Sequence, residues 1–105
     1  MALAKANTLI QQNPLVVFSK SFCPYCRKVK ELLKRLGANA KLIEIDEEKD
    51  GAELQAALAE ISGQRTVPNV FIAGQHIGGC DATVAANNKG TLVPLLKNAG
   101  VLQEK

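Results

Sequence analysis

The chain has 105 residues, of which 47% are hydrophobic, which suits one domain with an ordinary core and leaves no room for a second. Its 13 basic and 10 acidic residues are mixed along the chain and give a net charge of +3, which does not favour nucleic acid or a membrane as a partner. No apolar run approaches the roughly 18 residues of a spanning helix, and no targeting pattern is present at the start. We therefore expect one domain over residues 1–105, monomeric and cytoplasmic.

The first half of the chain alternates between helix-like and strand-like patterns. A short amphipathic helix ends at Asn13-Pro14, and the apolar run that follows has the composition of a buried strand. Gly37 suits the position that ends the second helix. A strand–helix–strand unit implies two parallel strands joined by a right-handed crossover. The expected elements are a helix over 3–12, a strand over 15–19, a helix over 24–36 and a strand over 41–45.

A third helix is expected to begin at Asp50, after a solvated acidic loop. Asp50 and Glu53 have the spacing of a capping box, in which the two side chains bond backbone N–H groups of the first turn. Gly63 would end this helix. Its inward-facing side chains would be Leu54, Ala57, Leu58 and Ile61.

The remainder of the chain combines a hairpin with two short helices. Residues 69–77 are typical of two strands that turn at Gly74 and form an antiparallel edge. Asp81 is expected to be the N-cap of a helix that reaches about Lys89, and Gly90-Thr91 separates it from a last helix. The complete order predicts an α/β fold with a four-stranded mixed sheet flanked by about five helices.

Two cysteines stand where the first strand passes to the second helix, in the motif Cys23-Pro24-Tyr25-Cys26. With Cys23 as the N-cap, Pro24 takes the first helical position, where its fixed φ suits the helix. The Cys23 sulfur then faces the free N–H groups and the positive end of the helix dipole, and such surroundings lower a cysteine pKa from about 8.5 to roughly 3.5–7.5. We therefore predict that Cys23 is a thiolate nucleophile and that the less exposed Cys26 resolves a disulfide formed on it.

The spacing of the two cysteines leaves other interpretations open. They could be small buried side chains of a helix. They could also form half of a zinc site, although a tetrahedral site needs four protein ligands and only His76 and Cys80 remain among the cysteines and histidines. His76 on the hairpin is more readily interpreted as an exposed strand residue. Because three cysteines are an odd number for a disulfide framework, the motif and its position favour a thioredoxin-like redox domain.

Two further motifs narrow this prediction. Thr66-Val67-Pro68 precedes the hairpin, where a proline suits the first residue of a strand, and Gly78-Gly79-Cys80-Asp81 follows it. Together with Lys20, Gln64 and the two-cysteine motif, in this order, they make the whole chain resemble the dithiol class of the glutaredoxin family, especially its plant and algal cytosolic members. The resemblance implies a thioredoxin-like fold. It also implies a cis peptide bond before Pro68, which would expose the Val67 backbone to an extended peptide.

In that family the peptide is glutathione, and the resemblance implies where it would bind. Lys20, helped by Gln64, would meet the glycine carboxylate, while the backbone N–H groups of Cys80 and Asp81 would hold the γ-glutamyl carboxylate. The Asp81 carboxylate would receive the amino group, and Tyr25 would flank the sulfur. The expected glutathione-binding residues are Lys20, Cys23, Tyr25, Gln64, Thr66, Val67, Pro68, Gly79, Cys80 and Asp81.

The resemblance implies a glutathione-dependent thiol–disulfide oxidoreductase. Cys23 would reduce glutathione mixed disulfides, and Cys23 with Cys26 would reduce protein disulfides. Glutathione would be the reducing co-substrate, the partners would be glutathionylated and disulfide-containing proteins, and no metal is expected. One alternative is a scaffold that holds a [2Fe–2S] cluster with glutathione, which Pro24 disfavours. Another is a thioredoxin reduced by a flavoenzyme, which Lys20 and Gly79-Cys80-Asp81 disfavour.

Two features have no assigned part in this chemistry. Cys80 is either a small residue under a tight turn or a regulatory thiol near the site. The second helix carries a basic face, which is solvated and could steer acidic partners. Its members are Arg27, Lys28, Lys30, Lys34 and Arg35.

Overall fold

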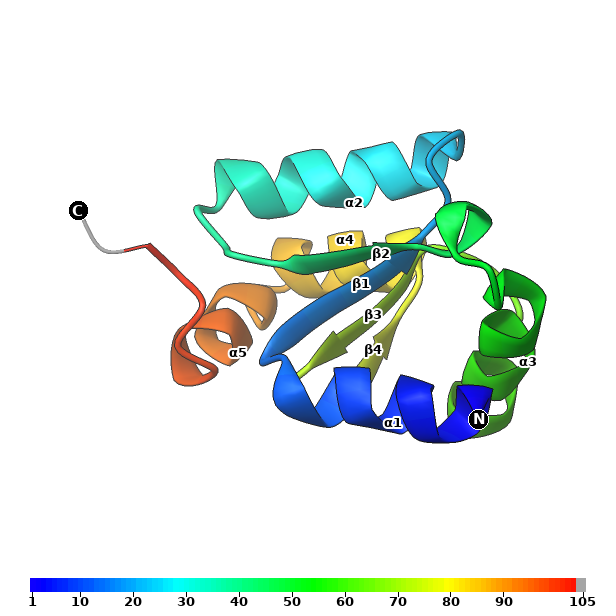
Figure 1. Ribbon diagram of the computed structural model, residues 1–105. Coiled ribbons are helices and arrows are strands. Elements are labelled where there is room, and N and C mark those ends of the chain that lie inside the picture. Colours follow the sequence, from blue (N-terminus) through cyan, green and yellow to red (C-terminus); the bar gives the residue numbers. More distant parts are fainter. Residues whose placement is uncertain (104–105) are drawn as a thin grey trace.

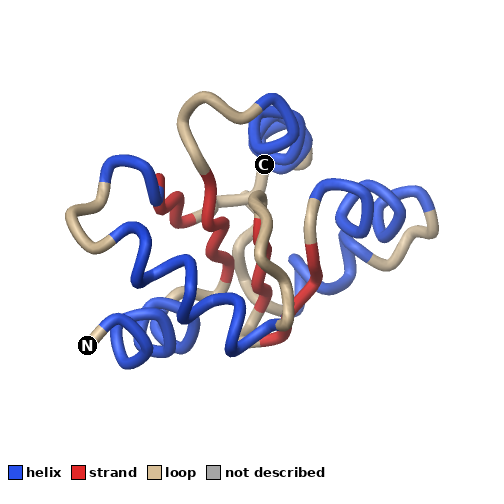
Figure 2. Tube along the Cα trace, turned by 90° about the vertical axis from the view of Figure 1, so that its right-hand side faces the viewer, coloured by secondary structure: helices blue, strands red, loops and turns tan. Residues whose placement is uncertain are grey.

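A computed structural model describes residues 1–103, and in it helices cover both faces of a central sheet (Figures 1 and 2). The strands are β1 (Leu15–Ser19), β2 (Lys41–Glu44), β3 (Asn69–Ile72) and β4 (Gln75–Gly78). The helices of this described part are α1 (Ala2–Gln12), α2 (Pro24–Arg35), α3 (Gly51–Ser62), α4 (Cys80–Asn88) and α5 (Leu92–Asn98), with a 3₁₀ turn, η1, at Ile45–Glu47. The expected α/β architecture is confirmed.

The sheet is mixed, with the strand order β2-β1-β3-β4. β1 and β2 are parallel and paired from Val16–Lys41 to Ser19–Glu44, as the strand–helix–strand pattern predicted. β3 runs antiparallel to β1 and to β4, so the hairpin does form the antiparallel edge. Its turn passes through Ala73 and Gly74, which both have positive φ. This arrangement leaves β2 at one edge and β4 at the other.

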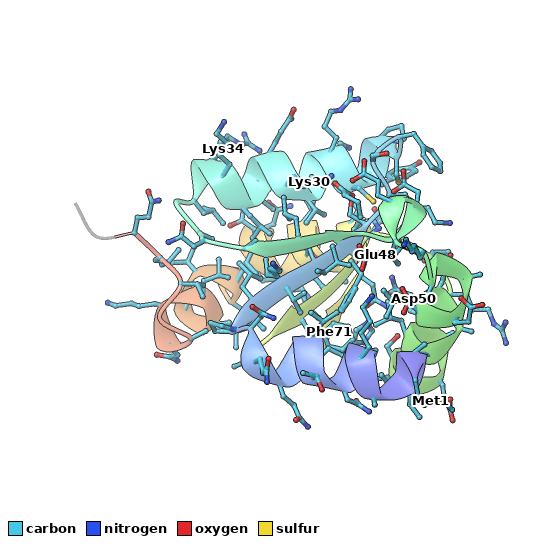
Figure 3. All side chains as sticks on the ribbon, in the orientation of Figure 1. Met1, Lys30, Lys34, Glu48, Asp50 and Phe71 are labelled. Atoms are coloured by element: carbon cyan, nitrogen blue, oxygen red, sulfur yellow. The ribbon has the colours of Figure 1, made fainter. Side chains whose placement is uncertain are left out.

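Every residue of β1 is buried, because helices pack on both sides of it. Leu15 and Val17 face the side covered by α2, α4 and α5. Val16 and Phe18 face the other side, where they pack with α1, α3 and Phe71 of β3 (Figure 3). A strand buried on both faces needs a continuous apolar run, and this is why the sequence shows no alternation there.

One expected strand ends earlier than predicted. The apolar pattern extended the second strand to Ile45, but β2 ends at Glu44 and Ile45 begins η1. Ile45 remains buried because the turn directs it into the cluster beneath α3. Tertiary packing therefore satisfied the apolar residue without keeping it in the strand.

The capping box predicted at the start of α3 is wrong. Asp50 does occupy the N-cap, but its side chain makes no capping hydrogen bond. Its carboxylate instead accepts from the Lys5 ammonium of α1 at 2.9 Å, and Glu48 accepts from the same ammonium at 2.8 Å. Glu48 and Asp50 lie on the segment that leads into α3 (Figure 3). A charged partner distant in the sequence has replaced the local one.

The N-cap predicted for α4 is displaced by two residues. The cap is Gly79, and Asp81 stands inside the first turn without a side-chain capping bond. A Cβ at position 79 would lie 3.4 Å from the Pro68 carbonyl oxygen, an ordinary van der Waals distance, so the start of α4 lies against the loop before β3. None of the helices within residues 1–103 combines the length and apolar character that crossing a membrane requires.

Candidate active site

The loop between β1 and α2 places Cys23 at the start of the helix. Cys23 is the N-cap, with an extended backbone, and Pro24 is the first helical residue. The Cys23 N–H donates to the Lys20 carbonyl at 3.1 Å, which closes the turn, and the Cys23 carbonyl accepts the first helical bond from the Arg27 N–H. The local geometry predicted for the motif is therefore confirmed.

Cys23 is the more ionisable of the two thiols. Its side chain is partly exposed, and Sγ lies 3.9 Å from the Val67 carbonyl oxygen. Burial opposes ionisation, but the N–H and thiol of Cys26, the N–H of Tyr25 and the charge of Lys20 together lower the pKa of Cys23. These groups favour the thiolate by proximity, since no side-chain capping bond is closed.

Cys26 has the opposite character. It is fully buried one turn into α2, and burial raises the pKa of its thiol, as does the neighbouring Cys23. Hydrogen bonding with the Lys20 backbone and the Ser19 side chain offsets part of this effect. Neither cysteine is in a disulfide. The motif thus combines an accessible, acidified sulfur with a protected, protonated one.

A cavity of about 540 Å³ lies beside this pair, between the N-terminus of α2, the loop before β3 and the start of α4. Of the ten residues predicted to bind glutathione, it brings together all except Lys20 and Cys23. Its lining residues are Tyr25, Gln64, Thr66, Val67, Pro68, Gly79, Cys80, Asp81 and Ala82. Segments that lie far apart in the sequence therefore form one concave surface next to Cys23.

The loop before β3 is organised by Gln64. Its amide nitrogen donates to the carbonyl oxygens of Thr66 and Pro68, at 2.9 and 2.8 Å. The Val67–Pro68 peptide bond is cis, as the resemblance implied. Because the Gln64 N–H groups are used to hold this loop, the role of Gln64 as a helper of Lys20 stays a prediction.

The start of α4 supplies backbone donors to the same cavity. Cys80 and Asp81 are the first two helical residues, and N–H groups at such positions have no acceptor within the helix. The Thr83 N–H already donates to the Gly79 carbonyl and so begins the helical ladder. Cys80 is buried and Asp81 is exposed. The predicted anion site at Cys80 and Asp81 therefore has suitable geometry.

Sequence reasoning missed Asp46, which lies on η1. Its carboxylate accepts hydrogen bonds from the N–H of Ser21, at 3.0 Å, and from the Ser21 hydroxyl. These bonds lower the pKa of Asp46 and tie the loop before Cys23 to the segment that follows β2. The only signal in the sequence is an acidic loop, which does not indicate a partner 25 residues away.

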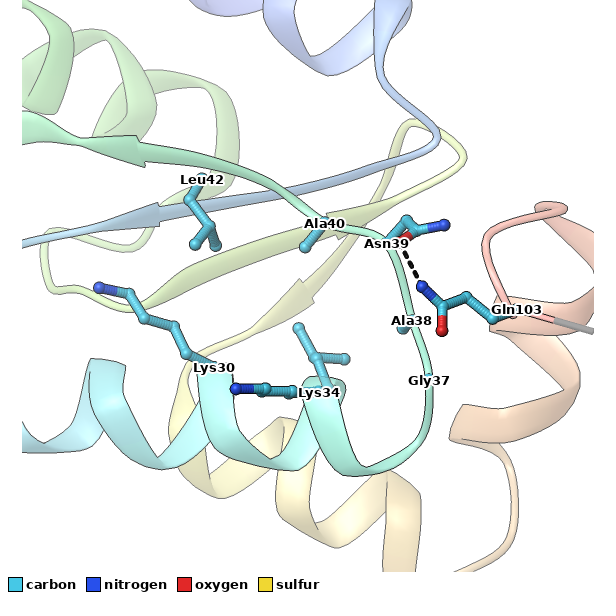
Figure 4. A pocket seen from close by; sticks show the side chains of 9 residues that line it. Lys30, Lys34, Gly37, Ala38, Asn39, Ala40, Leu42 and Gln103 are labelled. Atoms are coloured by element: carbon cyan, nitrogen blue, oxygen red, sulfur yellow. Dashed lines mark hydrogen bonds between the residues drawn. The ribbon is translucent and has the colours of Figure 1, made fainter.

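A slightly larger cavity, of about 570 Å³, lies away from the cysteines. It occupies the space between the second half of α2 and the segment that leads into β2 (Figure 4). Lys30 and Lys34 line it, together with Asn39 and Gln103, whose side chains are hydrogen-bonded. None of the predicted site residues belongs to this cavity, so the chemistry is located by the thiols and not by cavity size.

Other candidate ligands are engaged elsewhere. The ring nitrogen of His76 lies 2.9 Å from the Asn69 side-chain oxygen, and His76 is exposed on β4 as predicted. Across residues 1–103, no three side chains from His, Cys, Asp and Glu are grouped as metal ligands would be.

The fold and the two thiols define the class of protein: a thioredoxin-fold dithiol oxidoreductase with one thiol at a helix N-terminus. Residues 15–77 match the model of the glutaredoxin family. Glutaredoxin-C6 of Oryza sativa subsp. japonica is 63% identical over 102 residues, covering 97% of this chain and 91% of that protein. Glutaredoxin-C2 of Arabidopsis thaliana is 56% identical over the whole chain and 95% of its own length. The chain belongs to the glutaredoxin family, whose members are glutathione-dependent oxidoreductases.

Solved structures agree with this membership. A buckwheat glutaredoxin in complex with glutathione has a TM-score of 0.96 and 54% identity, over 98% of this chain and 94% of that one. Wheat glutaredoxin has a TM-score of 0.94 and 61% identity, over 97% and 96%. The predicted resemblance to plant members is confirmed. One rice relative, 57% identical, is named as chloroplastic, so the cytoplasmic location stays a prediction.

Proposed function

We propose that this glutaredoxin reduces glutathione mixed disulfides through Cys23 and protein disulfides through Cys23 and Cys26. The observation that supports this division is the opposite ionisation of the two sulfurs at one helix start. Cys23 is partly exposed with a lowered pKa, whereas Cys26 is buried with a raised pKa. An attacking thiolate must be exposed and ionised, whereas a resolving thiol is best kept buried and protonated until a mixed disulfide has formed on the attacking sulfur.

In the first reaction, the Cys23 thiolate attacks the glutathione sulfur of a mixed disulfide. An S–S bond forms between Cys23 and glutathione, the bond to the substrate sulfur breaks, and the substrate leaves as a thiolate that solvent protonates. A second glutathione thiolate then attacks the glutathione sulfur on Cys23. Oxidised glutathione is released and the Cys23 thiolate is restored.

In the second reaction, Cys23 attacks a protein disulfide and forms a mixed disulfide with one of its sulfurs. Cys26 loses its proton and attacks the Cys23 sulfur, which releases the reduced protein and leaves a Cys23–Cys26 disulfide. Two glutathione molecules then reduce this disulfide and become oxidised glutathione. Protein substrates of this kind are the partners that we propose.

We place glutathione in the 540 Å³ cavity, with its sulfur toward Cys23. The backbone of Val67 would pair with the peptide, and the N–H groups of Cys80 and Asp81 would receive the γ-glutamyl carboxylate. Lys20 would meet the glycine carboxylate from outside the cavity lining. The complex of the similar buckwheat glutaredoxin with glutathione supports glutathione as the ligand. We also propose that residues 1–105 form one monomeric domain, which the measured mass in solution would test.

The test uses two cysteine variants and two substrates, a small glutathione mixed disulfide and a protein disulfide. We expect Cys26→Ser to keep reduction of the mixed disulfide and to lose most reduction of the protein disulfide. Cys23→Ser should lose both, because no other exposed thiolate is present among the described residues. Full activity of the Cys23→Ser variant would contradict the proposed function.

A further inference from the structure

The outer face of α2 carries four exposed basic side chains. Arg27 and Lys34 are seven residues apart, as are Lys28 and Arg35, so two helical turns bring all four to one side. The opposite side is buried against the sheet through Val29, Leu32 and Leu33. Within residues 1–103, the ion pairs involve only Lys5 and Lys30 as bases, so none of these four cations is in an ion pair, and the exposed Glu31 is the one carboxylate of α2 among them. No other helix or strand of the described residues covers this face of α2 (Figure 1).

The helix dipole does not account for the first two of these cations. Basic groups near a helix N-terminus oppose the dipole, whereas acidic groups there are favourable. α3 and α4 follow this rule, with Glu53 and Asp81 in their first turns. α2 has no acidic residue in its first turn and continues directly with Arg27 and Lys28. Lys34 and Arg35, in the last turn, do suit the dipole, but they extend the same basic face.

An exposed aromatic side chain stands on the loop just before this helix. Phe22 is 70% exposed and directly precedes the nucleophile, and Tyr25 is 60% exposed. Tyr25 lines the cavity in which we place glutathione, but Phe22 does not. Phe22 therefore lies outside that cavity while remaining next to Cys23, where the non-glutathione half of a mixed disulfide must arrive.

We propose that Phe22, Arg27, Lys28, Lys34 and Arg35, together the α2 docking face, recruit protein substrates whose oxidised cysteine lies among acidic side chains. This inference rests on the proposed function, because such a substrate must present its disulfide to Cys23. Phe22 supplies an apolar contact beside the sulfur, and the four cations supply charge complementarity along the helix. The exchange at Cys23 is the one described above, and the docking face changes only the encounter that precedes it.

Most of the acidic residues of the chain lie on one segment outside α2. Residues 44–53 carry six carboxylates and one lysine, on β2, η1 and the start of α3. Glu44, Glu48 and Asp50 of this segment are in ion pairs with lysines. The other three carboxylates of the segment repel an acidic partner, whereas the cations of α2 attract it, and such a pattern favours one orientation as well as faster association.

The test compares two synthetic peptides of equal length, each with one glutathionylated cysteine. In one peptide, positions five to seven residues from the cysteine are Asp and Glu, and in the other they are Lys. This spacing follows because Lys34 is 11 residues beyond Cys23, roughly 16 Å along the helix, and an extended chain covers about 3.3 Å per residue. The small mixed disulfide of cysteine and glutathione serves as the reference substrate.

We expect the wild type to favour the acidic peptide over the basic one by about tenfold in kcat/KM at low salt, with the ratio approaching one at high salt. The double variant Lys34→Glu with Arg35→Glu should remove this preference. Because the Debye length at low salt, roughly 30 Å at 0.01 M, exceeds the distance from these positions to Cys23, the rate with the small reference disulfide reports any effect on the thiol itself. The matched control is Lys89→Glu with Lys97→Glu, which changes the net charge equally at the C-cap of α4 and on α5 and should keep the preference.

The aromatic part of the face is tested by Phe22→Ala. We expect a several-fold larger loss of kcat/KM for both peptides than for the small disulfide. The matched control is Val93→Ala, because Val93 is also exposed, at 39%, but lies on α5.

Three results would overturn the docking face while leaving the proposed function intact. These are equal rates for the two peptides on the wild type, an unchanged ratio in the Lys34 and Arg35 double variant, or an equal loss of the ratio in the Lys89 and Lys97 control. The salt dependence of the wild type decides the matter even where a variant does not fold. Failure of the wild type to reduce the small disulfide would instead contradict the proposed function itself.

Discussion

Helices α2 and α3 each have 12 residues and pack on opposite faces of the same sheet, yet their N-termini differ in charge. α3 begins with Asp50 and Glu53, and Asp50 pairs with Lys5 of α1. α2 begins with a thiol and a proline, has no acidic residue in its first turn, and continues with two cations. The dipole of α3 is thus complemented by carboxylates, whereas that of α2 is left available to a thiolate and to anions. We infer that the charges at the start of α3 stabilise the fold, whereas the start of α2 stabilises a reactive thiolate.

The largest effect is expected in the packing of α3 against the sheet. Leu54 of α3 is fully buried. Leu54→Ala should lower the free energy of unfolding by about 2–5 kcal/mol, because apolar contacts are lost and a cavity is left behind. Urea unfolding measures the loss. The control is Leu42→Ala, because Leu42 is 44% exposed and should change stability little. If our distinction holds, the folded Leu54→Ala protein keeps the ultraviolet titration midpoint of Cys23.

The next largest effect concerns the titration of the two thiols at the start of α2. Thiolate absorbance should show Cys23, in Cys26→Ser, with a titration midpoint below the ordinary value of about 8.5, and Cys26, in Cys23→Ser, with a midpoint above it. The lowered pKa means that Cys23 contributes stability above its unfolded pKa and loses it as pH falls through its folded pKa. The raised pKa means that Cys26 contributes stability below its unfolded pKa and loses it as pH rises through its folded pKa. The reverse order of midpoints would refute the division of roles.

A smaller effect is expected at Asp46, which connects the two regions. Asp46→Ala removes the acceptor for both the N–H and the hydroxyl of Ser21, so the loop before Cys23 loses its tie to η1. We expect kcat/KM for a small glutathione mixed disulfide to fall several-fold and the Cys23 titration midpoint to shift, with Asp46→Asn recovering part of the activity. Glu47→Ala, on the same turn, is the control. An unchanged midpoint together with unchanged activity would show that Asp46 does not position the loop.

The smallest effect is expected at Lys5. Its ammonium bonds Glu48 and Asp50, and these two hydrogen bonds raise its pKa, but all three side chains are more than a third exposed. Water and salt therefore screen the pairs, and Lys5→Met should lower the thermal unfolding midpoint much less than Leu54→Ala. The difference between Lys5→Met and wild type should shrink further in high salt. A loss as large as that of Leu54→Ala would show that ion pairs, and not the apolar cluster, hold α3.

Local patterns predicted most of the fold because helices, strands and turns depend on residues near one another in the chain. Gly63 ends α3 with a left-handed backbone, and the hairpin turns at Gly74, as the sequence indicated. The errors fell on polar side chains at helix starts. The Asp50 carboxylate accepts a hydrogen bond from Lys5 and not from the backbone of its own helix. The N-cap of α4 is Gly79 and not the predicted Asp81. A polar side chain can bond to partners that are distant in the sequence, and the local spacing of residues does not indicate which partners these are.

The sequence by itself determined the order of the elements and the position of the two cysteines at a helix start. It also determined, through the order of Cys23-Pro24-Tyr25-Cys26, Thr66-Val67-Pro68 and Gly79-Cys80-Asp81, the family that the chain resembles. The tertiary structure alone decided that these segments meet around one cavity, that Gln64 holds the loop of Pro68, and that Asp46 ties down Ser21. The physical reason is the distance along the chain over which each interaction acts. Helix periodicity, capping and turn geometry depend on residues a few positions apart, whereas burial and long-range hydrogen bonds form only when helices pack on the two faces of the sheet.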